Sequence, residues 1–232
     1  MNLIAFETST EACSVALWCD GEVLERFEVA PRRHAELALP WAQALLAEAG
    51  MARSQLDAVA VGRGPGAFTG VRLGIALAQG IALALDLPML PVSTLAALAM
   101  RAPAPGKVLA AIDARMGEVY VAAFERTAAG VEPLGPESVL APDAVQLPAG
   151  DGAWQGVGTG FGAMEGVLQS RLGAVLSSVD AGALPGAGDL ARLAALAWAR
   201  GEQVPPELVE PAYLRDNVAL TLDQQRALRA AR

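Results

Sequence analysis

The sequence predicts an α/β protein made of two lobes that share one plan. Short apolar runs typical of buried strands alternate with longer segments of helical periodicity. A unit of strand, carboxylate, polar turn and strand occupies residues 3–18 and returns at residues 108–124. A Pro/Gly-rich segment at residues 102–106 separates the two units. We therefore expect a lobe boundary near this segment, and no short-period repeat.

The N-terminal lobe is expected to span residues 1–104. Its first strand covers residues 3–6, and Asp20-Gly21 then predicts a β-hairpin between two further strands. Helices are expected over residues 34–49 and 69–85, with a buried strand between them at 57–61 and another after them at 89–92. Ser93 can cap a short helix that follows.

The C-terminal lobe is expected to span residues 105–205. Strands at 108–112 and 119–124 open it, a glycine-rich loop lies at 156–160, and an Ala/Leu-rich helix covers 189–200. Residues 206–232 are predicted to return to the N-terminal lobe and to end in a helix.

Composition limits the classes of function. Of the 232 residues, 53% are hydrophobic and 18% are charged, so much apolar surface must be covered. The net charge of −8 argues against a protein that grips nucleic acid by itself, because phosphate binding needs a basic face. No targeting segment is visible, and residues 71–87 are too short and too polar for a membrane span. Cys13 and Cys19 are expected to be reduced, as in a cytoplasmic protein.

Metal chemistry is not expected. His34 is the only histidine, so no pair of imidazoles can share a metal ion. We expect His34 at the surface or at an interface.

The glycine loop GRGPGAFTGVRLG follows a predicted strand and precedes a predicted helix. A P-loop is excluded because the loop has no lysine, and a dinucleotide fingerprint lacks its acid after the next strand. The remaining interpretation is structural: the glycines allow a tight turn and close packing of the helix.

Small residues recur at every fourth position of that helix, at Gly70, Gly74, Ala78 and Ala82. The opposite positions are large and apolar, so the helix needs cover on all sides. Burial within the chain is one explanation. We favour the other, a second subunit that packs on Gly70, Gly74 and Ala78, with the first helix contributing Leu37, Trp41 and Leu45 to the same interface.

Two carboxylates end strands at equivalent places in the two lobes, Glu7 and Asp113. In a two-lobed fold they could face a shared cleft and position a Mg²⁺-nucleotide or a water, with Thr8 and Ser9 beside them. Alternatively they cap turns and bond to local amides. The sequence leaves both open.

Several segments together resemble the TsaB family: LIAFETSTEACSVAL, VGRGPGAFTGVRLGIALAQG, IDARMGEVYVA and PAYLRDNVA. They occur in the family's order and span nearly the whole chain. The resemblance implies an actin-like (ASKHA) duplicated α/β fold, in which each lobe has a mixed sheet flanked by helices.

The resemblance also implies a scaffold or activator and not an enzyme. The family acts beside TsaD, the related catalytic subunit, and TsaE, a small ATPase, in transferring threonylcarbamoyl to the adenosine next to the anticodon of tRNAs that read codons starting with A. On this basis we expect a heterodimer with TsaD, a homodimer alone, and contact with tRNA only through the complex. No intrinsic cofactor is expected, because the partner subunits would bind ATP and Mg²⁺.

One position departs from the family pattern: its first strand usually ends in Asp-Thr-Ser, whereas this chain has Glu7-Thr8-Ser9. The metal histidines of TsaD have no counterpart here, which excludes the catalytic paralogue. Two other classes stay open, an actin-like small-molecule kinase or ATPase that uses Glu7 and Asp113, and an inactive metalloprotease (glycoprotease) relative.

Overall fold

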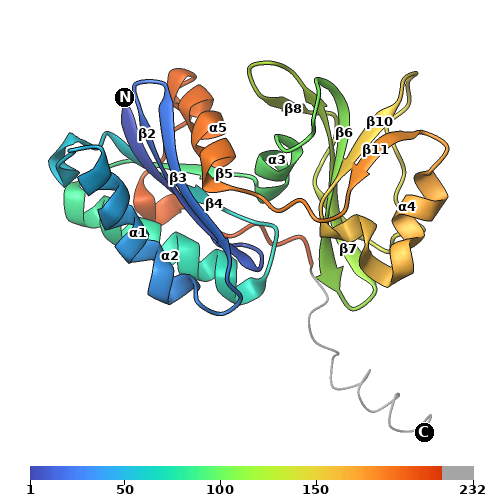
Figure 1. The fold of residues 1–232 in the computed structure, drawn as a ribbon, viewed down its shortest axis with the longest axis horizontal. Coiled ribbons are helices and arrows are strands. Elements are labelled where there is room, and N and C mark those ends of the chain that lie inside the picture. Colours follow the sequence, from blue (N-terminus) through green and yellow to red (C-terminus); the bar gives the residue numbers. More distant parts are fainter. Residues whose placement is uncertain (216–232) are drawn as a thin grey trace, which may run out of the picture.

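The computed structural model describes residues 1–215, so the helix predicted over residues 222–231 lies outside the described part of the chain. The described residues form two lobes, each built around one sheet (Figure 1). The N-terminal sheet has the order β3-β2-β1-β4-β5. Its strands are β1 (Asn2–Glu7), β2 (Ala12–Cys19), β3 (Glu22–Val29), β4 (Ala58–Gly62) and β5 (Met89–Val92).

The C-terminal sheet has the order β11-β10-β6-β7-β8, and β9 also pairs with β7. Its strands are β6 (Gly106–Arg115), β7 (Glu118–Arg126), β8 (Val131–Pro133), β9 (Ser138–Leu140), β10 (Trp154–Val157) and β11 (Leu176–Asp180).

The two sheets have the same topology. β1 runs antiparallel to β2 and parallel to β4, which is in turn parallel to β5. In the second lobe, β6 runs antiparallel to β7 and parallel to β10, which is parallel to β11. Both sheets are mixed and flanked by helices, which confirms the predicted duplicated α/β fold.

Helices cover both faces of each sheet. α1 (His34–Glu48) and α2 (Phe68–Leu85) lie on one face of the N-terminal sheet, and α5 (Ala187–Ala199) lies on the other (Figure 1). Alternate residues of β1 serve the two faces: Ile4 and Phe6 join the cluster under α1 and α2, whereas Leu3 packs against α5. In the C-terminal lobe, α3 (Thr94–Ala99) and α4 (Val167–Leu172) lie on opposite faces.

α5 belongs to the N-terminal lobe, although the sequence assigned it to a C-terminal lobe of residues 105–205. Leu190 lies in the core cluster that contains Leu3 of β1. The strands of that lobe also cap the helix: the Ala187 amide donates to the Ser14 hydroxyl at 2.9 Å, and the Gly188 amide donates to the Glu25 carboxylate at 2.8 Å. These contacts satisfy amides of the first turn, so the chain returns well before residue 206.

α3 joins the lobes, whereas the boundary predicted at residue 104 placed it wholly in the first lobe. Its Leu95 and Leu98 pack on the C-terminal sheet, and Ala97 packs in the cluster of the N-terminal sheet. Ser93 caps the helix as predicted, since its hydroxyl accepts a hydrogen bond from the Ala96 amide at 3.1 Å.

Both cysteines are free thiols, as expected. Burial raises the pKa of Cys13 to about 11, and the nearby Glu28 and Glu7 carboxylates act in the same direction. The Cys13 thiol is therefore protonated near neutral pH and has the character of an apolar core group.

Candidate functional site

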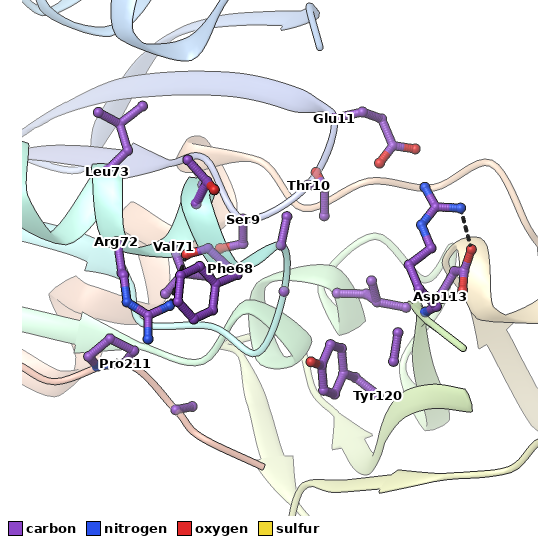
Figure 2. A pocket seen from close by; sticks show the side chains of 18 of the residues that line it. Ser9, Thr10, Glu11, Phe68, Val71, Arg72, Leu73, Asp113, Tyr120 and Pro211 are labelled. Carbon is purple, nitrogen blue, oxygen red and sulfur yellow. Dashed lines mark hydrogen bonds and ion pairs between the residues drawn. The ribbon is translucent and has the colours of Figure 1, made fainter. Parts of the chain in front are cut away.

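A cleft of about 1140 Å³ lies between the two lobes (Figure 2). The loop after β1, the start of α1 and the first turns of α2 form its N-terminal side. The turn between β6 and β7 forms the opposite side, and residues 211–215 run along its edge. Of the four predicted nucleotide-binding residues, Ser9 and Asp113 line this cleft.

Glu7 is sealed inside the N-terminal lobe with no exposed surface. Its carboxylate accepts hydrogen bonds from the Ser9 amide at 2.7 Å and from the Thr94 hydroxyl at 3.3 Å. Burial raises the pKa of Glu7, and the hydrogen bonds from Ser9 and Thr94 only partly oppose that effect. Because the Glu7 carboxyl group is fully buried, it cannot contact a Mg²⁺-nucleotide in the cleft, and its role is structural.

Thr8 and Ser9 are also used internally. The Thr8 hydroxyl donates to the Gly70 carbonyl of α2 at 2.8 Å, and the Ser9 and Thr94 hydroxyls are hydrogen-bonded at 2.8 Å. Both side chains are buried. They fix the loop after β1 against α2 and α3, which is the local role that the sequence left open.

Asp113 closes its own turn at the end of β6. One carboxylate oxygen accepts from the Arg115 amide at 2.8 Å, and the other accepts from the Arg115 guanidinium at 2.8 Å (Figure 2). The Asp113 amide donates to the Thr159 hydroxyl at 3.1 Å. Asp113 therefore faces the cleft with its carboxylate paired to Arg115, as in the turn-capping alternative.

Arg72 lies at the edge of the cleft between two aromatic rings. Its guanidinium carbon is 3.3 Å from the centroid of the Phe68 ring and 5.0 Å from that of Tyr213 (Figure 2 labels Arg72 and Phe68). It also donates to the Tyr213 hydroxyl at 2.7 Å. This stack attaches the C-terminal segment to α2.

His34 is buried, so its predicted position at the surface or an interface is wrong. Its Nε2 lies 2.9 Å from the Thr10 carbonyl and 3.2 Å from the Ala12 carbonyl, which makes it the donor to both. The ring holds the start of α1 against the loop after β1. Among residues 1–215, no group of three metal-ligating side chains occurs.

The small-residue stripe of α2 faces inward, so the prediction that it packs on a second subunit is wrong. A side-chain carbon at Gly70 would overlap the Thr8 carbonyl, and one at Gly74 would lie 2.5 Å from the Thr8 hydroxyl. Ala78 is fully buried in the core cluster under α1 and α2. The stripe lets α2 approach the loop after β1, which is the structural role expected of these glycines.

The predicted contribution of α1 to that interface fails for the same reason. Leu37 and Leu45 are buried in the cluster that contains the stripe, and Trp41 packs against that cluster while partly exposed. The outward face of α2 differs from the buried stripe. Its exposed residues are mostly small or apolar: Phe68, Thr69, Ala76, Gly80, Leu83 and Ala84.

Judged by length and composition alone, one helix of the described residues could cross a membrane, and that helix is α2. Its buried residues explain part of this character, because Val71 and Ile75 pack into the N-terminal core. Phe68 and Leu83 explain the rest, with 68% and 64% of their surface exposed.

Sequence reasoning missed two arginines that form ion pairs with the C-terminal lobe. Arg63 pairs with Glu137, and Arg215 pairs with Glu118, across separations of 74 and 97 residues. No local pattern encodes partners so far apart in the chain. Only the position of Arg63 inside the glycine loop drew attention to that region.

The comparisons with known proteins agree with this architecture. Residues 27–221 match the family model described as TsaD, tRNA N6-adenosine threonylcarbamoyltransferase. The tRNA threonylcarbamoyladenosine biosynthesis protein TsaB of Escherichia coli (strain K12) is 45% identical, with 94% of this chain and 96% of that protein covered. The TsaB of Haemophilus influenzae is 38% identical, with 94% and 95% covered.

A solved structure, YeaZ from Pseudomonas aeruginosa, superposes with a TM-score of 0.83 at 46% identity, covering 92% of this chain and 99% of that chain. Identity of this order across nearly the full length of several relatives shows the family. The chain therefore belongs to the TsaB family of tRNA threonylcarbamoyladenosine biosynthesis proteins, within the wider TsaD family that the matched model describes.

Proposed function

We propose that this chain is a non-catalytic subunit in the synthesis of threonylcarbamoyladenosine in tRNA. It acts with TsaD and TsaE, in the cytoplasm, when the threonylcarbamoyl group is transferred to the adenosine next to the anticodon. The names of the relatives support the pathway.

The observation that carries the non-catalytic role is the state of the two strand-end carboxylates. Glu7 is sealed in the core, and Asp113 is already paired with Arg115. An actin-like kinase or ATPase needs free carboxylates in its cleft to position the metal of a metal-nucleotide. Here neither group is free, so ATP and Mg²⁺ are assigned to the partner subunits, and the chain is given no cofactor of its own.

The outward face of α2 is the surface we assign to TsaD. Phe68 and Leu83 are exposed there beside Ala76, Gly80 and Ala84, and Leu39 of α1 is 40% exposed. Small residues between large apolar ones allow a helix of a partner to approach closely. In the absence of TsaD, the same face would pair two copies of this chain as a homodimer.

We assign contact with tRNA to the complex with TsaD and TsaE, and not to this chain alone. The net charge of −8 opposes binding of an isolated chain to a polyanion. Arginines at the cleft are partly neutralised, since Arg115 and Arg215 pair with Asp113 and Glu118.

A reconstitution experiment tests the proposal. The purified chain is mixed with TsaD, TsaE, a threonylcarbamoyl-adenylate synthase and a transcribed tRNA, and modified adenosine is quantified by mass spectrometry. Modification should require the chain, and a pull-down should recover TsaD with it. ATP hydrolysis or phosphoryl transfer by the chain alone, with no dependence of tRNA modification on it, would support the kinase alternative instead.

A further inference from the structure

The segment that follows α5 runs along the N-terminal lobe and ends on the C-terminal lobe. We name residues 204–215 the strap; it is the red trace that leads toward β7 in Figure 1. Val204 and Met89 exchange two backbone hydrogen bonds of 2.9 Å, which makes the start of the strap an extra pairing for β5. Gln79 of α2 donates to the Pro206 carbonyl at 2.8 Å.

The middle of the strap is fixed to the glycine loop and to α2. The Ala212 amide donates to the Arg63 carbonyl at 2.8 Å. The Tyr213 hydroxyl accepts from Arg72 at 2.7 Å, and its ring lies over the same guanidinium. Up to this point every anchor belongs to the N-terminal lobe.

The end of the strap is fixed to the other lobe. The Arg215 guanidinium donates to the Glu118 carboxylate at 2.6 Å and to the Ala114 carbonyl at 3.1 Å, both on the β6–β7 hairpin. Only 18% of the Arg215 side chain is exposed. This is a charge-assisted contact in a partly water-excluded place, where such bonds are stronger than at an open surface.

A second tie crosses between the lobes beside the first. The Arg63 guanidinium lies 3.1 Å from the Glu137 carboxylate, which precedes β9 in the C-terminal lobe. Glu137 also accepts from the hydroxyl of Ser93, the cap of α3, and its side chain is 16% exposed. Arg63 thus holds the strap through its carbonyl and the C-terminal lobe through its side chain.

We propose that the strap fixes the opening of the cleft, with Arg215–Glu118 and Arg63–Glu137 as its two ties to the C-terminal lobe. The chain crosses between the lobes through α3, which links β5 to β6, and again at residues 181–186, which link β11 to α5. Crossings of this kind let two lobes rotate about a hinge. Arg215 lines the cleft, and Arg63 precedes the residues of the glycine loop that line it. Both ties join the N-terminal lobe to the C-terminal lobe. They therefore oppose that rotation, and the protein keeps one cleft geometry.

The test uses two substitutions that remove charge but keep side-chain size, Glu118→Gln and Glu137→Gln, alone and combined. Glu48→Gln is the matched control, because Glu48 forms an exposed ion pair with Arg26 inside the N-terminal lobe. Hydrogen exchange at the Ala212 amide reports detachment of the strap, and the radius of gyration from small-angle X-ray scattering reports the opening of the cleft.

The combined variant should exchange at Ala212 about tenfold faster than the control, which corresponds to about 1.4 kcal/mol, and its radius of gyration should rise. Each single variant should show a smaller change in the same direction. Arg63→Glu alone should exchange faster than the wild-type chain, and adding Glu137→Arg, which exchanges the two charges, should restore the slower exchange. The proposal is overturned if the combined variant matches Glu48→Gln in both measurements. Should the combined variant unfold, the single variants decide, and their agreement with the control in both measurements overturns the proposal equally.

Discussion

Gly62 lies directly against the carboxyl group of Glu7, and a side-chain carbon at Gly62 would overlap that group. The contact follows from strand register: β1 and β4 pair in parallel with Phe6 opposite Val61, so the next residues on the two strands are neighbours. A glycine at the end of β4 thus makes room for a carboxyl group inside the lobe. This arrangement explains why Glu7 takes no part in the cleft.

Replacing Glu7 by glutamine should make the stability of the protein less dependent on pH. Burial raises the pKa of Glu7 above its ordinary value of 4.5, so the folded chain keeps a proton that the unfolded chain loses. The stability of the wild-type protein is then greatest below pH 4.5 with respect to this group, and it falls as the pH rises toward the folded-state pKa. Glutamine is neutral and similar in size, so it removes this loss.

Urea unfolding of both proteins at pH 4 and pH 8 measures the effect. The free energy of unfolding of Glu7→Gln relative to wild type should be higher at pH 8 than at pH 4, with a slope of at most about 1.4 kcal/mol per pH unit. An equal difference at both pH values would mean that folding leaves the pKa of Glu7 unchanged, which would contradict the effect of burial.

The sequence predicted the order of the elements as far as β7, the helix α5 and the duplication, because these strands and helices carry local patterns. It did not predict β8, β9, β11 or α4, and it placed a glycine-rich loop over the end of β10. It also predicted turn geometry, since Asp20 and Gly21 both have the positive φ that an Asp-Gly hairpin requires. Periodicity identified two faces of α2 but could not decide which one meets the sheet. The larger side chains suggested the wrong face, because the space beside Thr8 admits only glycine at 70 and 74.

Local sequence patterns could not predict which lobe a helix packs against or whether a carboxylate is buried. α5 has a small-residue face that would fit either sheet, and it is the caps supplied by Ser14 and Glu25 that join it to the N-terminal lobe. The roles of Glu7 and Asp113 were likewise undecided, because a carboxylate at a strand end looks the same in sequence whether it is sealed or exposed. Burial alone separates the two cases.

Two glycine substitutions on α2 should have opposite effects on stability. Gly74→Ala places a carbon 2.5 Å from the Thr8 hydroxyl in a packed core, and overpacking of this kind costs about 1–3 kcal/mol. Gly80→Ala meets nothing within 4 Å on the outward face and should stabilise the helix by about 0.5–1 kcal/mol. Thermal unfolding of the isolated chain measures both. If Gly74→Ala were harmless and Gly80→Ala destabilising, α2 would be oriented the other way round.

Leu83→Glu should weaken association with TsaD and leave the fold intact. Leu83 is 64% exposed on the outward face of α2, so a charge there costs little in the free chain but is unfavourable inside an apolar interface. We expect at least a tenfold loss of affinity, about 1.4 kcal/mol, by surface plasmon resonance. The control is Val175→Glu, since Val175 is 43% exposed in the C-terminal lobe. Equal affinity for the two variants would move the TsaD surface away from α2.

The isolated chain should bind Mg²⁺-ATP weakly or not at all. Glu7 has no exposed surface, and Asp113 is held by the Arg115 amide and guanidinium, so a metal-nucleotide would have to break an ion pair before it gained a ligand. Titration calorimetry should show no saturation at nucleotide concentrations up to about 1 mM, which corresponds to about −4 kcal/mol. Arg115→Ala is the informative variant, because it frees Asp113 without touching the core; a modest gain in Mg²⁺-dependent binding is expected if pairing is what blocks the site. A dissociation constant near 1 μM for the wild-type chain, about −8 kcal/mol, would contradict the non-catalytic role and restore the kinase alternative.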